Sequence, residues 1–192
     1  MGAALKGEPV GVEEAGWRAW VPPAAPQPWA VVTGPAGPLP MLEAAPALPV
    51  VPAVRLAALW VVGAHGGAGE STVAGLTGDW LPAGHTWPAR PLPARCVLTA
   101  RTSVGGLLAA QAALRQWAAG DAPVDLLGLV LLADAPGRLP RALRDLAGLV
   151  AGGAPRCWSI PWIEAWRLGE PHVTGDVTRL IRDLTAVIDN HH

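Results

Sequence analysis

Short apolar runs alternate with stretches of helical periodicity through residues 55–190. The runs predict strands over residues 55–63, 95–100, 126–133 and 156–160. The stretches between and after them predict helices over residues 71–80, 103–119, 140–151 and 174–189. This alternation predicts a three-layer α/β domain with a short parallel sheet and right-handed crossovers. A Pro-rich loop without further strands is expected over residues 81–94.

Signals at the helix ends support these boundaries. Thr102 or Ser103 can cap the second helix, and Gly120 follows its last turn. Pro140 suits the first turn of the third helix, which is expected to end near Gly152. The last helix carries an apolar stripe, as expected of a helix packed on a sheet, made of Leu180, Ile181, Leu184, Val187 and Ile188.

Residues 1–54 differ in composition from the rest of the chain. They hold eleven of the 21 prolines, which argues against regular helix and central strand. We therefore expect a Pro/Ala-rich irregular arm, 1–54, followed by the α/β domain, 55–190. The arm is either extended on the surface of the domain or disordered. Trp17, Trp20 and Trp29 favour an arm packed on its own domain, with presentation of the indoles to another protein as the alternative.

Composition narrows the classes of function. A formal net charge of −1 gives no electrostatic case for nucleic-acid binding. No apolar run free of proline and charge reaches the length of a membrane span, and we expect a cytoplasmic protein without a signal peptide. Cys96 and Cys157 fall in expected strands, where buried free thiols fit better than a metal site. His191 and His192 establish no metal site either.

The first strand runs directly into a glycine-rich loop and an expected helix start. This order of strand, glycine loop and helix is typical of a P-loop. Glycines let successive backbone N–H groups turn toward one anion, and the start of a helix adds the positive end of its dipole. The candidate phosphate-binding residues are Gly63, His65, Gly66, Gly67, Ala68, Gly69, Glu70, Ser71 and Thr72.

Residues 65–72 resemble the deviant P-loop of the ParA/MinD family of ATPases, which reads K-G-G-x-G-K-S/T-T. Six of the eight positions agree, and His65 and Glu70 stand in place of the two lysines. Similar losses occur in pilus-assembly and septum-site relatives of MinD, and in a group of small actinobacterial proteins. The chain therefore looks like a degenerate member of this family with a P-loop-like fold.

The resemblance implies a role for several positions. In the family the two lysines hold and neutralise the nucleotide phosphates, so the changes at His65 and Glu70 alter that chemistry. Ser71 corresponds to the hydroxyl that meets Mg²⁺ when a Mg-nucleotide binds. The loop Pro161–Glu164 corresponds to the last loop of MinD-like domains, which helps to enclose the base.

Glu70 is the decisive departure from the P-loop pattern. Two unit charges about 4 Å apart interact by about 4 kcal/mol at an effective dielectric of about 20, so a carboxylate in a phosphate cradle opposes ATP. The alternative is that Glu70 lies favourably at the helix N-terminus or pairs with an arginine such as Arg101. We expect little ATP turnover by the isolated protein and assign no catalytic residue.

The function that these features favour is a non-hydrolysing binding or positioning adaptor with a protein partner and no cofactor. One alternative is an active ATPase that binds ATP and Mg²⁺ through a cation supplied elsewhere, for which a homodimer is one arrangement. Another is a structural subunit of a larger assembly. The retained glycines favour nucleotide binding, whereas the lost lysines favour the adaptor.

Two further motifs favour structural roles. Residues 134–137 read Asp-Ala-Pro-Gly, which is somewhat similar to a nucleotide switch but fits a turn better at this late position. Arg138, Arg141 and Arg144 lie on overlapping sides of one expected helix. They favour a solvated face, with an acidic partner or DNA as the alternative.

Overall fold

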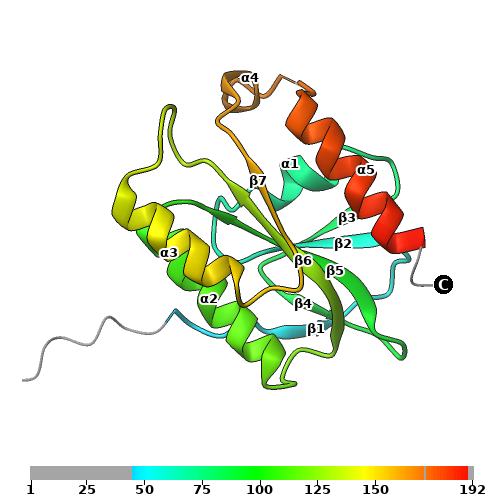
Figure 1. Ribbon diagram of the computed structural model, residues 1–192. Coiled ribbons are helices and arrows are strands. Elements are labelled where there is room, and N and C mark those ends of the chain that lie inside the picture. Colours follow the sequence, from blue (N-terminus) through cyan, green and yellow to red (C-terminus); the bar gives the residue numbers. More distant parts are fainter. Residues whose placement is uncertain (1–44, 171, 190–192) are drawn as a thin grey trace, which may run out of the picture. The chain divides into compact units, whose positions relative to one another are not determined.

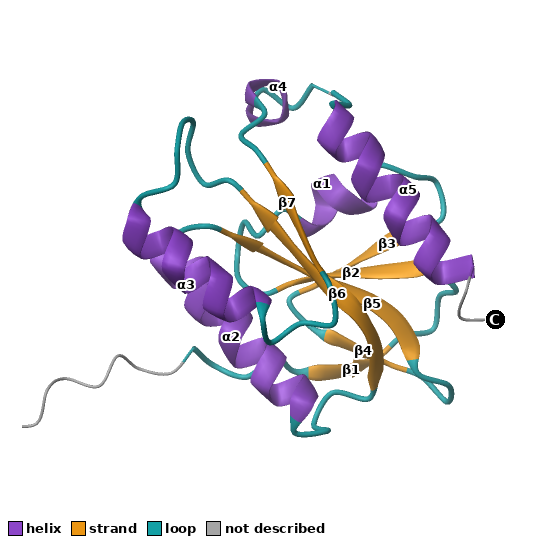
Figure 2. Ribbon diagram, viewed as in Figure 1, coloured by secondary structure: helices purple, strands orange, loops and turns teal. Residues whose placement is uncertain are grey.

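A computed structural model of the protein describes residues 45–170 and 172–189. The strands are β1 (Val50–Pro52), β2 (Leu59–Gly63), β3 (Trp80–Gly84), β4 (Trp87–Ala89), β5 (Ala94–Arg101), β6 (Val124–Leu132) and β7 (Cys157–Ile160). The helices are α1 (Glu70–Ala74), α2 (Val104–Ala118), α3 (Arg141–Ala151), α4 (Glu164–Arg167) and α5 (Gly175–Asp189). Figures 1 and 2 show these elements as an α/β arrangement around one central sheet.

The central sheet has five strands in the order β3-β2-β5-β6-β7, and every neighbouring pair is parallel. The predicted strands 55–63 and 126–133 therefore belong to one parallel sheet, as β2 and β6. Every residue of β2 is buried, as is most of β6. Both strands are buried on two faces, which accounts for their nearly continuous apolar sequence.

Helices cover both faces of this sheet. Alternate residues of a strand point to opposite faces, so Trp60 and Val62 pack on one side and Leu59 and Val61 on the other. The first side is covered by buried residues of α2 and α3, and the second by those of α1 and α5. The expectation of an α/β domain with a parallel sheet is confirmed.

The predicted caps of the long helices are also observed. The Ser103 hydroxyl accepts a hydrogen bond from the Gly106 N–H at 3.2 Å, and Gly120 has a positive φ of 84°. Helix α3 follows Pro140 and is capped by Gly152. Helix α5 buries the apolar stripe predicted for it, except that Ile181 is only partly buried. None of the helices in the described residues is both long and apolar enough to cross a bilayer.

The interval after the glycine loop was predicted wrongly. Helix α1 ends at Ala74 instead of near residue 80, because Gly75 caps it and the chain soon enters β3. The expected loop over 81–94 contains most of β3 and all of β4. Strand β3 lies at the edge of the sheet beside β2, where a residue such as Pro82 is tolerated.

The folded body also begins before the boundary expected at residue 55. Strand β1 pairs in parallel with β4, and Leu48 is buried in the core beneath α2. Strand β1 is not part of the central sheet and forms a separate two-stranded sheet with β4. Trp17, Trp20 and Trp29 lie outside the described residues, so the expected packing of the arm stays a prediction.

The two cysteines have different environments. Cys96 on β5 is buried, as expected, and burial raises its pKa above the ordinary value, with a smaller contribution from Asp125. Cys157 on β7 is exposed, contrary to expectation. The cause is its position at the start of an edge strand, where one side of the sheet is incompletely covered.

Candidate functional site

The glycine loop connects the end of β2 to the start of α1. Gly67 and Gly69 have positive φ values of 77° and 90°, a conformation that glycine adopts without strain. A Cβ on Gly69 would also lie 3.1 Å from a methyl group of Leu132. Backbone hydrogen bonds fix the loop's start to β5, through Ala64 N–H and Thr99 O at 2.9 Å. The glycine pattern therefore reflects a real backbone requirement.

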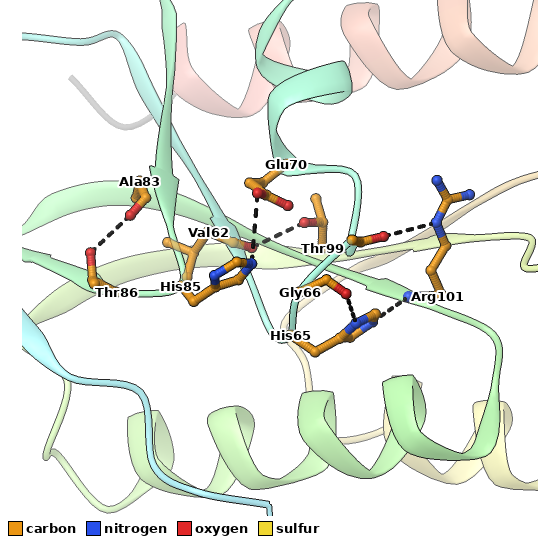
Figure 3. A network of polar contacts seen from close by, with 10 residues as sticks. Val62, His65, Gly66, Glu70, Ala83, His85, Thr86, Thr99 and Arg101 are labelled. Atoms are coloured by element: carbon orange, nitrogen blue, oxygen red, sulfur yellow. Dashed lines mark hydrogen bonds and ion pairs between the residues drawn. The ribbon is translucent and has the colours of Figure 1, made fainter. Parts of the chain in front are cut away.

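His65 is held within the loop (Figure 3). Its Nε2 accepts a hydrogen bond from the Arg101 N–H at 3.1 Å, and its Nδ1 lies 2.8 Å from the Gly66 carbonyl oxygen. These contacts fit a neutral imidazole that donates through Nδ1 and accepts through Nε2. His65 thus replaces a lysine with a side chain that ties the loop to the end of β5.

Arg101 supplies a cation beside the loop. Its Nε donates to the Gly67 carbonyl at 3.2 Å, and its Nη1 donates to the Ala133 carbonyl at 3.0 Å. The guanidinium therefore joins the glycine loop to the end of β6. The predicted alternative of a Glu70–Arg101 ion pair is wrong, because Arg101 bonds backbone carbonyls while Glu70 faces a histidine.

Glu70 begins α1 and turns its carboxylate back toward β3 (Figure 3). Its Oε1 lies 3.7 Å from Nε2 of His85, and the side chain is only 13% exposed, against 45% for His85. The carboxylate lies so close to Gly63 that a Cβ there would be 2.8 Å from Oε2. The sequence reasoning missed this pair because β3, which positions His85 beside β2, was expected to be a loop.

A cavity of about 490 Å³ opens beside the loop, at the carboxyl ends of β2, β5 and β6. Ligands of parallel α/β sheets bind at this edge. The loop, the ends of the strands and the segment around α4 form its walls. The lining residues are His65, Gly66, Gly67, Thr72, Arg101, Ser103, Leu132, Asp134, Pro161, Trp162, Ile163, Trp166 and Arg167.

The α4 segment forms the wall opposite the loop. The indole N–H of Trp162 donates to Oε2 of Glu164 at 2.7 Å, and the Arg167 guanidinium carbon lies 5.8 Å from the centroid of the Trp162 ring. The Trp166 indole donates to the His172 carbonyl at 2.8 Å. Of this wall, the family resemblance implied only that the loop Pro161–Glu164 helps to enclose the base of a nucleotide. Arg167 and Trp166 were missed because α4 has a single turn and no periodicity.

The cavity brings together only part of the predicted set. Thr72 lines it, whereas Ser71, the expected Mg²⁺ contact, is exposed and absent from the described lining. Glu70 is likewise absent from that lining. Asp134 lines the cavity, and its backbone N–H bonds the Thr102 hydroxyl at 3.1 Å. Across the described residues, no three His, Cys, Asp or Glu side chains are grouped to hold a metal ion.

Comparison with known proteins gives a family but no activity. No curated protein matches the chain, and neither does any solved structure. The model of one family matches residues 57–182, which include β2, the glycine loop, the cavity walls and half of α5. The chain therefore belongs to DUF6668, a family of unknown function.

Proposed function

We propose that the protein is a degenerate P-loop protein, similar to ParA and MinD, that acts as a non-hydrolysing binding or positioning adaptor. The observation that carries this proposal is the position of Glu70. Its carboxylate occupies the sequence position of the P-loop lysine, folds over Gly63 and lies 3.7 Å from His85. The residue that would neutralise a phosphate is replaced by an acid with a local structural contact.

The physical argument concerns the charge that phosphoryl transfer develops. Transfer of the γ-phosphoryl group needs cations placed against its oxygens. At the loop, Glu70 contributes a negative charge and His65 is engaged with Gly66 and Arg101. Hydrogen bonds to β5 hold the backbone of the loop in place without supplying that chemistry. A rigid corner of this kind suits the positioning of a partner.

A second candidate function is ATP binding through a relocated cation. Arg101 and Arg167 both line the 490 Å³ cavity that the loop borders. A volume of this size is within the usual range for small-molecule sites. In this alternative, the two guanidinium groups and Thr72 would meet a Mg-nucleotide, and Trp162 would flank it. The family resemblance assigns the Mg²⁺ contact to Ser71, yet Ser71 lies outside the described lining.

Calorimetry with Mg-ATP and a phosphate-release assay on the full chain separate these candidates. The adaptor predicts no phosphate release above the buffer. Binding without release, weakened by Arg167→Ala, would support the relocated cation as a binding device only. If the protein releases phosphate and Ser71→Ala abolishes this release, the adaptor proposal is wrong and the protein is an ATPase.

The converse substitution tests the electrostatic argument. Glu70→Lys restores the family's cation, so Mg-ATP binding should strengthen relative to the natural chain. Glu70→Gln is the matched control, because it removes the negative charge without adding a positive one. If Glu70→Lys and Glu70→Gln both leave binding unchanged, charge at this position does not account for the lost nucleotide chemistry.

A further inference from the structure

Strand β7 is the last strand of the central sheet, and within the described residues no strand pairs with its outer edge. Among the described strands it pairs only with β6. The carbonyls of Arg156 and Ile160 accept hydrogen bonds from β6, from the N–H groups of Leu129 and Ala133. Successive residues of a strand direct their backbone groups to opposite sides. The N–H and C=O groups of the residues between, Cys157 and Ser159, therefore face away from β6.

Cavities border β7 on both faces of the sheet. Toward α3 lies a largely apolar groove of about 850 Å³, whose walls include Leu131, Leu143 and Ala147. Cys157 and Ser159 are exposed and form part of its floor. Toward α5 lies a smaller cavity of about 360 Å³. Figure 1 shows β7 between α3 and α5.

The unpaired charges around these cavities are mostly positive. Arg138 and Arg144 line the apolar groove, and Arg156 lines the smaller cavity. In the part of the chain that is described, none of the three has an ion-pair partner. The nearby acids are largely neutralised, since Asp176 pairs with Arg179 and Asp183 pairs with Arg182, which leaves Asp134.

We propose that β7 binds an extended segment of another protein, rich in apolar and acidic residues, as a sixth strand of the sheet. The free backbone groups of Cys157 and Ser159 would bond the added strand. Its side chains alternate between the two faces, so one set enters the apolar groove and the other enters the smaller cavity. Carboxylates on the segment would meet Arg138, Arg144 and Arg156.

A second copy of this chain fits the edge less well. Symmetric pairing of two β7 strands would place the same arginine-bearing surface on both sides of the junction. The arginines of the two copies would then repel each other, whereas the acidic segment proposed above would place carboxylates beside them. This inference goes beyond the proposed function and does not use the glycine loop, so nucleotide experiments leave it unaffected.

Selection from a display library of random ten-residue peptides against the full chain tests the proposal. Enriched peptides should carry apolar residues at alternate positions together with Asp or Glu. Ser159→Pro should weaken their binding at least about tenfold, because it removes an edge N–H. Proline at this site keeps the pairing with β6, since only the outward N–H is lost.

A pair of charge variants provides a test that does not depend on the proline. Arg144→Glu reverses a charge in the groove and should weaken binding. Arg141→Glu reverses an exposed charge of the same helix outside the groove, and it should leave binding unchanged. Cys157 gives a direct readout, because it is exposed on the groove floor while Cys96 is buried. Bound peptide should slow the reaction of Cys157 with a thiol reagent.

Three results would overturn the proposal. The first is a library with no enrichment above background. The second is enriched peptides whose binding is unchanged by both Ser159→Pro and Arg144→Glu. The third is a dimer in analytical ultracentrifugation that Ser159→Pro dissociates, since the occupant of the edge would then be a second copy.

Discussion

Two adjacent glycines of α2 differ in whether a larger side chain would fit at their positions. A Cβ on Gly106 would lie 2.3 Å from the Arg101 carbonyl oxygen and 2.9 Å from Nε2 of His65. A Cβ on Gly105 would meet nothing within 4 Å. Gly106 therefore allows α2 to approach the hydrogen bond that holds His65 against β5. The shape of the glycine loop depends on a residue about forty positions away.

Alanine at each position should separate these roles. We expect Gly106→Ala to reduce the free energy of unfolding by about 1–3 kcal/mol, because the backbone of Arg101 must move. Gly105→Ala should leave stability unchanged or raise it by up to about 1 kcal/mol, since alanine favours the helix. Urea unfolding of both variants measures the difference. Equal effects would mean that the close approach at Gly106 is unimportant.

At the scale of elements, Gln116 of α2 holds the small sheet. Its side chain accepts from the Leu48 N–H at 2.9 Å and donates to the Leu48 carbonyl at 2.8 Å. The same oxygen accepts from the indole N–H of Trp87 on β4 at 3.0 Å. Leu48 precedes β1, so one side chain connects both strands of the small sheet to α2.

Removal of this contact should loosen β1 selectively. Gln116→Ala leaves the backbone of Leu48 and the indole of Trp87 without their partner, at an expected cost of about 1–3 kcal/mol. Gln111→Ala, on the same helix but outside this contact, is the matched control. Amide hydrogen exchange should become faster in β1 for Gln116→Ala alone. Unchanged exchange there would show that strand pairing suffices without Gln116.

At the scale of the whole molecule, the composition leaves the two cysteines as the main side chains that can lose a proton between about pH 8 and pH 11. The chain has no tyrosine, and Lys6 is its only lysine. Arginine stays protonated throughout this range. Burial, together with Asp125, raises the pKa of Cys96, and partial desolvation raises the pKa of Cys157 although that residue is exposed. Stability above pH 9 should therefore report mainly on these two thiols.

The sign of the pH dependence follows from the protonated folded thiol. Unfolded Cys96 ionises with its ordinary pKa of 9.0, while the folded thiol stays neutral. The contribution of the neutral Cys96 thiol to the free energy of unfolding is complete below pH 9, and it is lost as the pH rises above 9. In a Cys157→Ser background, the free energy of unfolding should fall by about 1.4 kcal/mol per pH unit above that value.

Chemical denaturation across a pH series provides the measurement. Cys96→Ala in the same background should abolish most of the slope, although it lowers stability at every pH by leaving a cavity. A slope that persists in the double variant would assign alkaline loss to another group.

The sequence by itself determined strands β2, β5, β6 and β7 of the parallel sheet, the three long helices and the position of the glycine loop. These features follow from short-range signals. The apolar runs of β5 and β6 and the cap at Ser103 depend on neighbours within a few residues. Local periodicity and backbone preference were therefore enough to predict them. The nucleotide chemistry expected from the loop stays a prediction.

Only the tertiary structure decided which side chains meet around that loop. Glu70 lies beside His85 because β3 pairs with β2, and Arg101 bonds the Gly67 carbonyl because β5 lies beside β2. Short strands with proline carry little periodic signal, and their formation depends on an adjacent strand supplying hydrogen bonds. The physical reason is that pairing between distant segments fixes these contacts, whereas local sequence leaves the partner of each side chain undetermined.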